Sequence, residues 1–358
     1  MFEVDWEKWK IGKRAILRLI LVTILLSICF PLIWYTKQES FILLKKTTWL
    51  IDDAAGGWTN VTIQFKTLTT RSHVNNNHVK VKPTEKPYTC DGCFSKQFKF
   101  LINNEGICKT DNVSINILIM ITSSPQNKVS RNAIRDTWLT YAKKNNGNIR
   151  YVFLLGESPM TKELEKENLQ TKDIIFGNFK DAYNNLTYKT LMGYQWATQH
   201  CKSAQFVMKT DDDMFVHIPG LTRAIKENSK VLQTAVGGNC RQSARPIRNT
   251  RSKWYASLKS YPQKTYPGFC SGTGYVTSLN VVTKIVKISK NVPFFHLEDV
   301  YVSLCIKQLG LKLHYIDGFM RTFGLCRNEY NVLVTVHQVA VNRMRRMWET
   351  LCAPKDKK

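Results

Sequence analysis

Short apolar runs alternate with amphipathic segments from residue 115 onward, and this alternation constrains the fold more than any other feature. Three of the runs have the length and composition of strands buried on both faces: Ile115–Ile121, Tyr151–Leu155 and Phe206–Met208. Helical spacing or charge patterning marks the segments that follow them: Arg131–Tyr141, Thr161–Gln170 and Leu186–Gln199. Alternating strands and helices predict an α/β domain with a mostly parallel central sheet, which binds its ligands beyond the carboxyl ends of the strands.

Three consecutive aspartates, Asp211, Asp212 and Asp213, follow closely on the third apolar run. Apolar segments on both sides make adjacent carboxylates costly unless a cation neutralises them. Mg²⁺ and Mn²⁺ prefer carboxylate oxygens and often bind substrate phosphates as well. A solvated turn or a helix N-cap is the alternative, because Pro219 begins another predicted helix. We favour a divalent-metal site.

A second acidic pair, Glu298 and Asp299, lies in apolar surroundings. Burial raises the pKa of a carboxyl group and can make it a competent general base. Residues 300–309 are predicted to be helical, so the pair could equally be a favourable helix N-terminus, and both interpretations can hold together.

Two glycines, Gly272 and Gly274, lie two residues apart in the segment Cys270–Tyr275. Glycines let the backbone turn sharply or approach a ligand closely. From the spacing alone, a tight connection between two elements is the favoured interpretation.

The uncharged apolar run Leu19–Thr36 predicts a membrane-spanning helix, which needs about 20 mostly apolar residues. Basic residues precede the run more densely than they follow it, which predicts a cytoplasmic N-terminus. A cleaved signal peptide is the alternative, but no clear small-residue cleavage site follows the run.

Four regions follow from this topology. They are a cytoplasmic tail (1–14), a transmembrane signal-anchor helix (15–36), a stem rich in Lys, Thr and Asn (37–110) and a lumenal domain (111–358). Within the stem, the apolar stretches 41–44 and 98–102 are exceptions that could pack on the main domain.

Sequons and cysteines agree with a secretory lumen. Three glycosylation sequons begin at Asn60, Asn112 and Asn185. Of the 10 cysteines, all but Cys29 follow the predicted anchor, so disulfides are expected and the odd number leaves at least one cysteine free or paired between chains. Cys90 and Cys93 lack the second ligand pair of a zinc site, which favours disulfide bonding.

The chain is strongly basic, with 52 Lys and Arg against 27 Asp and Glu and a net charge of +25. Such an excess points to an anionic partner such as nucleic acid, a membrane surface or a phosphorylated ligand. Residues 37–358 carry 47 of the basic and 24 of the acidic residues, so the excess lies in the predicted lumenal part. A lumenal location excludes nucleic acid as the partner.

Seven ordered motifs within residues 90–352 resemble those of the β1,3-galactosyltransferase and β1,3-N-acetylglucosaminyltransferase family, the Golgi type II enzymes of glycosyltransferase family 31. The motifs are Arg131–Trp138, Phe153–Gly156, Phe179–Thr190, Lys209–Asp213, Tyr266–Tyr275, Glu298–Tyr301 and Val336–Gln338. The chain departs from the family pattern at Asn178, Tyr188 and Ser303, and none of these carries an assigned chemical role.

The resemblance implies a GT-A-type fold, a nucleotide-sugar donor and inversion at the anomeric carbon. It implies that Asp211, Asp213 and His337 bind Mn²⁺, with Asp213 the most direct ligand, and that Asp212 contacts the ribose or the metal shell. By the same resemblance Asp299 is the catalytic base, and Glu298 contacts the acceptor or donor sugar.

Other residues take donor-binding roles by the same resemblance. Arg131 and Arg135 are expected to contact the nucleotide, although Arg135 could instead brace Asp136 or a neighbouring loop. Gly272 and Gly274 are expected at the donor, whereas Trp138 is expected in the core. The residues around these glycines look closer to galactosyltransferases, which favours UDP-galactose.

The resulting hypothesis is a Golgi membrane galactosyltransferase that forms β1,3 linkages to glycans of glycoproteins or glycolipids. A homo-oligomer is a candidate assembly. An N-acetylglucosaminyl- or N-acetylgalactosaminyltransferase is the near alternative. An inactive lumenal chaperone or carbohydrate-binding relative is a second one, and it conflicts with the presence of all the expected acids. A metal-dependent phosphohydrolase would explain only the aspartate triplet.

Overall fold

The computed structural model describes residues 48–52, 58–62, 98–109, 114–157, 161–319 and 333–353. Two compact units divide the chain, residues 1–80 and 81–358. In the first, β1 (Thr48–Asp52) and β2 (Trp58–Thr62) pair as antiparallel strands. The predicted anchor at 15–36 lies outside the described residues, and none of the helices described here is long and apolar enough to cross a membrane.

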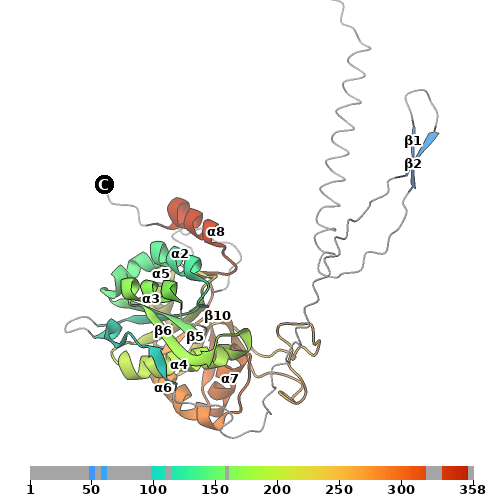
Figure 1. The fold of residues 1–358 in the computed structure, drawn as a ribbon. Helices are drawn as coiled ribbons and strands as arrows, with labels where there is room; N and C mark the ends of the chain where they lie inside the picture. Colours follow the sequence, from blue (N-terminus) through green and yellow to red (C-terminus); the bar gives the residue numbers. More distant parts are fainter. Residues whose placement is uncertain are drawn as a thin grey trace, which may run out of the picture. The chain divides into compact units, whose positions relative to one another are not determined.

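The second unit is built around an eight-stranded sheet (Figure 1). Its strand order is β11-β9-β10-β7-β4-β5-β6-β3. The four central strands β7, β4, β5 and β6 are mutually parallel, while β10 and β3 run antiparallel to their neighbours. The strands span β3 (Phe100–Ile102), β4 (Ile117–Thr122), β5 (Ile149–Glu157), β6 (Ile174–Lys180), β7 (Phe206–Asp211), β9 (Ala235–Arg241), β10 (Phe269–Ser278) and β11 (Lys312–Tyr315).

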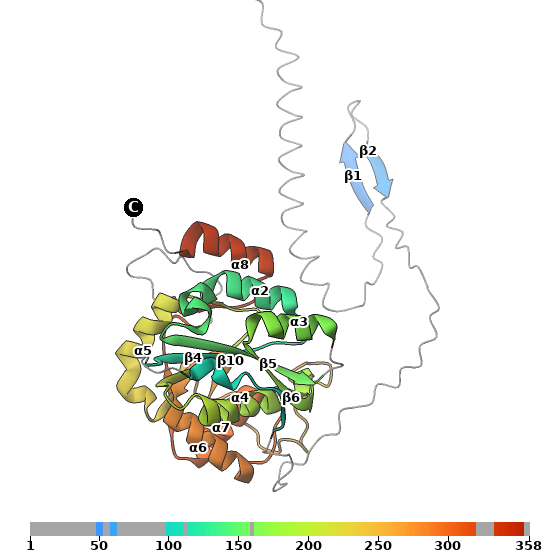
Figure 2. The same ribbon diagram turned by 60° about the vertical axis from the view of Figure 1, so that its left-hand side comes forward.

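Helices cover both faces of this sheet (Figure 2). One face packs against α2 (Lys128–Asp136), α3 (Lys162–Thr171), α5 (Ile218–Leu232) and α8 (Val341–Met347). The other packs against α4 (Leu186–His200), α6 (Leu279–Ile288) and α7 (Glu298–Gln308). Burial on both sides explains why β4 reads as an uninterrupted apolar run: Leu118 and Met120 face one core, and Ile117, Ile119 and Ile121 face the other.

Short helical turns complete the unit: η1 (Glu105–Cys108), η2 (Trp138–Asn145), η3 (Tyr183–Asn185), η4 (Ser289–Asn291) and η5 (Trp348–Cys352). The single helix predicted over 131–141 is wrong in extent, because α2 ends at Asp136 and η2 begins at Trp138. Between them the backbone leaves the helical region at Thr137. The break lets the fully buried Trp138 donate its indole N–H to the Met214 carbonyl (3.1 Å), as expected for a core residue.

The glycine pair lies within a strand, so the tight connection favoured from its spacing is wrong. Gly272 and Gly274 belong to β10, whose pairing with β9 is interrupted between Cys270 and Tyr275. A Cβ at Gly272 would lie 2.9 Å from a carboxylate oxygen of Glu298. Glycine is needed there because the start of α7 lies against the strand.

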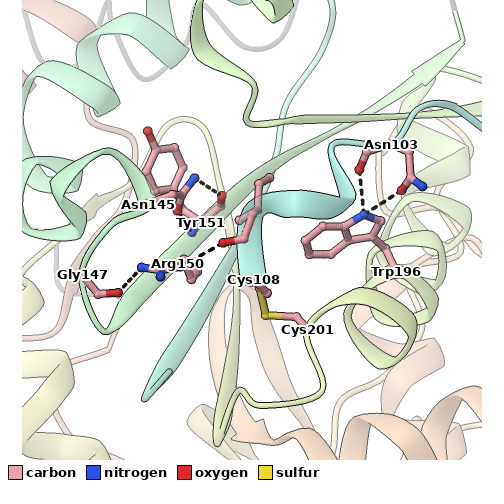
Figure 3. The surroundings of a disulfide bond; sticks show 9 residues. Asn103, Cys108, Asn145, Gly147, Arg150, Tyr151, Trp196 and Cys201 are labelled. Carbon is pink, nitrogen blue, oxygen red and sulfur yellow. Dashed lines mark hydrogen bonds between the residues drawn. A yellow bond between two sulfur atoms is a disulfide. The ribbon is translucent and has the colours of Figure 1, made fainter. Parts of the chain in front are cut away.

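The segment 98–109, assigned from the sequence to the stem, is part of the folded unit (Figure 3). Strand β3 pairs with β6 at the sheet edge, and Cys108 is disulfide-bonded to Cys201 after α4. The Trp196 indole donates to the backbone and side-chain oxygens of Asn103, at 2.9 and 3.0 Å. The unit therefore begins upstream of residue 111, and the suggested packing of 98–102 on the main domain is confirmed.

A separate two-stranded sheet joins β8 (Phe215–Val216) to β12 (Thr335–Val336). It brings the C-terminal region beside the aspartate triplet. Gly220, in the first turn of α5, permits this approach because a Cβ there would overlap the carbonyl oxygen of Leu333.

Replacing Gly220 tests this close approach. Alanine normally stabilises a helix relative to glycine by about 0.5–1 kcal/mol. Because of the overlap with Leu333, we expect Gly220→Ala instead to destabilise the protein by about 1–3 kcal/mol. Thermal unfolding measures the effect. Gly106→Ala is the matched control, since a Cβ there meets no atom within 4 Å; a stabilised Gly220→Ala variant would contradict the packing.

Candidate active site

The aspartate triplet lies at the carboxyl end of β7, the position that ligands prefer in a sheet of this kind. In the parallel pairing of β4 with β7, Thr122 is opposite Asp211, and its hydroxyl donates to the Asp211 carboxylate. Asp212 accepts hydrogen bonds from the Ser123 hydroxyl (2.7 Å) and the Asn127 amide (2.9 Å). Residues at the end of β4 and in the segment after it therefore orient the first two aspartates.

Asp213 faces His337, which follows β12. The Asp213 Oδ2 and His337 Nε2 atoms are 3.6 Å apart, and the Val339 N–H donates to the Asp213 carbonyl (2.8 Å). The other carboxylate oxygen of Asp213 is buried and has no hydrogen-bond partner among the residues that the structure describes. Burial raises the pKa of Asp213, the Asp211 charge raises it further, and His337 acts in the opposite direction. Such a carboxylate is suited to a cation.

The chemistry of this pair fits a divalent metal, because carboxylate oxygen and imidazole nitrogen are both ligands of Mn²⁺. Within the described ranges, no three acidic, His or Cys side chains come together as a complete metal site. Asp213 and His337 would thus supply two ligands, leaving positions for substrate phosphate oxygens or water. One oxygen of Asp211 accepts hydrogen bonds from Thr122 and Lys209, and its expected role as a metal ligand stays a prediction.

Lys209 connects the triplet to the second acidic pair. Its buried ammonium group donates to Asp211 Oδ1 (2.7 Å) and to the Gly272 carbonyl, and it lies 3.4 Å from Glu298 Oε2. Burial alone would lower the pKa of Lys209, but the charges of Asp211 and Glu298 outweigh it and raise the pKa. A permanent cation therefore lies between the two sets of carboxylates.

The acidic pair occupies the first turn of α7, so the helix-N-terminus interpretation holds alongside the chemical one. Asp299 accepts hydrogen bonds from the backbone N–H groups of Val300 (2.9 Å) and Gly272 (3.3 Å). Burial raises the pKa of Asp299, and these two hydrogen bonds partly oppose the shift. A half-buried carboxyl with a raised pKa meets the requirements of a general base.

Glu298 is more enclosed than Asp299. One oxygen accepts a hydrogen bond from the Tyr275 hydroxyl, which also lies 3.1 Å from the Tyr194 hydroxyl. Burial raises the pKa of Glu298 to about 7, although Lys209 acts to lower it. Both oxygens of Glu298 thus face groups of the protein, which suits a positioning role better than proton transfer.

The two arginines expected at the nucleotide are bound within the protein. The buried guanidinium of Arg131 donates to both oxygens of Glu167 (2.8 and 2.7 Å) and to the loop Ser123–Pro125. Arg135 pairs with Asp173 and Glu167 and lies over the Phe153 ring, 4.7 Å from its centroid. Arg131 therefore supports the loop that carries Ser123, and Arg135 braces a neighbouring loop, as its alternative interpretation allowed.

Lys189 and Asp181 are site-forming residues that the sequence reasoning missed. The Lys189 ammonium lies 3.0 and 2.8 Å from the Asp181 oxygens and donates to the Ser123 carbonyl. Asp181 also accepts the Gly156 N–H (2.7 Å). Both residues lie within the Phe179–Thr190 motif, and a lysine inside an otherwise apolar helical stripe was the available signal.

Comparison with known proteins agrees with this arrangement. Residues 129–317 match the sequence profile of the galactosyltransferase family. The chain is 38% identical over 265 residues to mouse (Mus musculus) beta-1,3-galactosyltransferase 1, covering 72% of this chain and 80% of that protein. It is 37% identical over 245 residues to mouse beta-1,3-galactosyltransferase 5, covering 66% and 78%.

Among solved structures, the WbbM bifunctional glycosyltransferase aligns over 68% of this chain and 51% of its own, at 9% identity and a TM-score of 0.38. That likeness is too distant to identify the fold. The sequence matches are sufficient by themselves: the chain belongs to the galactosyltransferase family, which confirms its resemblance to the β1,3-galactosyltransferases.

Arg131→Met separates a supporting role from nucleotide contact. The substitution removes the guanidinium group that binds both oxygens of Glu167 and leaves the buried Glu167 carboxylate without it. We therefore expect a loss of about 3–5 kcal/mol in the free energy of unfolding. Adding Glu167→Gln should recover part of that loss, because a neutral side chain then replaces the buried charge. Denaturant unfolding measures both; unchanged stability with weaker nucleotide binding would restore the contact role.

Proposed function

We propose that this protein transfers galactose from UDP-galactose to the 3-hydroxyl of an acceptor sugar, inverting the anomeric configuration to form a β1,3 linkage. The observation that carries the proposal is the Lys209 bridge, which holds the aspartate triplet beside the acidic pair. A group that binds the diphosphate and a group that accepts a proton thus lie on opposite sides of one buried cation. A GT-A-type fold is part of the proposal, supported by the parallel strand block with the triplet at its carboxyl end.

Asp299 is the proposed base. It removes the proton of the acceptor 3-hydroxyl as that oxygen attacks the anomeric carbon from the face opposite to UDP. The backbone N–H groups of Gly272 and Val300 orient the carboxylate and leave it half-buried beside the strand. Glu298 and Lys209 hold α7 against β10. They therefore fix the position of Asp299 and do not themselves accept the proton of the 3-hydroxyl.

Asp213 and His337 would hold Mn²⁺, with Asp211 and Asp212 beside them. When bound, the metal ion supplies positive charge to the diphosphate of the leaving group. The loop after β4, oriented by Arg131 and Lys189, supports Asp212 at the ribose side through Ser123. Gly272 leaves β10 without a side chain where the Glu298 and Asp299 carboxylates approach it, and Gly274 lies two residues further along the strand.

The location of the activity is proposed from the sequence. A signal-anchor helix at 15–36 would hold the enzyme in the Golgi membrane as a single-pass type II protein with its domain in the lumen. The disulfides Cys108–Cys201 and Cys240–Cys270 support an oxidising compartment. Glycans on glycoproteins or glycolipids would be the acceptors.

The direct experiment incubates the full chain with Mn²⁺, a panel of UDP-sugars and β-linked acceptors, followed by linkage analysis of the product. Turnover of UDP-galactose with a new β1,3 bond supports the proposal. Turnover of UDP-N-acetylglucosamine or UDP-N-acetylgalactosamine alone would favour the alternative donors. Binding of glycans without turnover of any donor would favour an inactive relative.

Asp299→Asn tests the base. Because the amide cannot accept the proton, we expect kcat to fall by about 10²–10⁴-fold. Binding of UDP, measured by calorimetry with Mn²⁺ present, should change little. Asp136→Asn is the matched control, since Asp136 is exposed and its ion-pair partner within the described part of the chain is Arg345, at 3.5 Å. Equal losses in both variants, or full activity of Asp299→Asn, would remove Asp299 from the reaction.

The raised pKa values predict a pH dependence. Glu298 is protonated below its pKa of about 7 and ionised above it. The ionised carboxylate pairs with Lys209 and holds Asp299 in position, so kcat should rise as pH increases through about 7. Tyr275→Phe removes a hydrogen bond that lowers the pKa of Glu298, and it should therefore shift the rise to higher pH. A profile with the same midpoint in both proteins would contradict a role for Glu298 ionisation.

A further inference from the structure

The positive charge of the chain is concentrated in one stretch. Residues 228–297 contain eleven Lys and Arg and no Asp or Glu. The proposed donor needs only a few cations, and the side chains proposed for its metal and ribose, Asp211, Asp212, Asp213 and His337, lie outside this stretch. The excess therefore calls for a second anionic ligand or surface.

Most of this charge belongs to the long connection 242–268 between β9 and β10. Arg248 folds the connection by donating to four backbone carbonyls, those of Ala256, Ser257, Tyr261 and Gln263. The disulfide Cys240–Cys270 joins its two ends. The connection thus has a defined shape.

The remaining cations of the connection point to solvent: Arg245, Arg251, Lys253, Lys259 and Lys264 are all exposed. Within the part of the chain that the structure describes, none of them forms an ion pair with a carboxylate. Their charges are therefore available to a ligand.

Lys253 lies between two exposed aromatic rings. Its ammonium group is 4.7 Å from the centroid of the Trp254 ring and 6.0 Å from that of Tyr183. Trp254 is 49% exposed and Tyr183 45%, although large aromatic side chains are usually more buried. Tyr183 precedes α4, so two distant segments contribute to one exposed cluster.

This cluster is next to the carboxylates of the proposed active site. Tyr183 lies two residues after Asp181, which pairs with Lys189. Lys189 also donates to the Ser123 carbonyl, and the Ser123 hydroxyl binds Asp212 of the triplet.

Burial raises the pKa of the Tyr183 hydroxyl, and the charges of Asp299 and Asp211 raise it further, in agreement with this placement. A ligand that covers Tyr183 and Trp254 would thus extend toward Asp299, the proposed base for the acceptor.

We infer that Tyr183, Lys253 and Trp254 form an acceptor subsite for an anionic glycan, one that carries a sulfate or a carboxylate. Aromatic faces suit the apolar faces of sugar rings, and the lysine pairs with the anionic substituent. The inference rests on the proposed function for the identity of the reaction. A lipid surface is the competing ligand, but the rings flank a cation beside the carboxylates, and this arrangement favours a single sugar residue.

The test compares transfer to three probes by the full chain. They are a β-linked N-acetylglucosamine glycoside, the same glycoside with a 6-sulfate, and a disaccharide ending in glucuronic acid. We expect kcat/KM for at least one anionic probe to exceed that for the neutral probe by about fivefold, the size of an exposed ion pair. The sulfate and carboxylate arms identify the anionic group.

Lys253→Glu should abolish that preference, and Lys253→Gln should reduce it. Lys290→Glu is the matched control, because it makes the same charge change in the acid-free stretch but outside the connection. A preference that survives Lys253→Glu, or that falls equally in Lys290→Glu, overturns the inference.

Two further readouts separate the possible failures. Hydrolysis of UDP-galactose without an acceptor reports the proposed function alone. If this hydrolysis is absent, binding of the fluorescently labelled 6-sulfated glycoside decides the inference. We expect Lys253→Glu to abolish that binding. Vesicles containing phosphatidylserine test the lipid alternative. If Lys253→Glu weakens vesicle binding but leaves the acceptor preference intact, the surface contacts membrane and the inference is wrong.

Discussion

A single buried ammonium group, that of Lys209, connects the parts of this site. It lies among Asp211, Glu298 and the Gly272 carbonyl, which come from β7, α7 and β10. Without this cation the two sets of carboxylates would repel each other in a poorly solvated environment. The close fit of α7 to β10 then follows, because the strand has no side chain at Gly272 where the Glu298 carboxylate approaches. Asp299 takes its position from that fit.

The predictable part of the fold comes from local pattern. Buried parallel strands such as β4 are uninterrupted apolar runs, and the helices over 161–170 and 186–199 have clear patterning, so their positions are confirmed. The break at Thr137 was not visible, because Trp138 and Tyr141 keep helical spacing while their backbone does not. β10 was missed for a related reason: glycines are typical of turns, and contact with α7, which explains Gly272 in a strand, appears only in the folded structure.

The residues of the site divide in the same way. Asp213 and His337 are far apart in sequence and were joined only through the family resemblance, and the structure brings them to 3.6 Å. Arg131 was expected at the nucleotide through the same resemblance, whereas its partner Glu167 lies in a helix whose contact with α2 no sequence pattern indicates. Lys189 was missed because its partner Asp181 is informative only once the loop after β6 is folded. Charge identity is visible in a sequence, whereas charge pairing depends on tertiary contacts.

The cross-link between Cys240 and Cys270 has an evolutionary consequence. It closes the connection 242–268 at its base, next to the strand that carries Gly272. Substitutions within the connection can therefore alter its charge and aromatic content while the ends keep their positions. Acceptor preference in such a protein can diverge by exchange of one surface segment, without a change in the carboxylates that the chemistry needs.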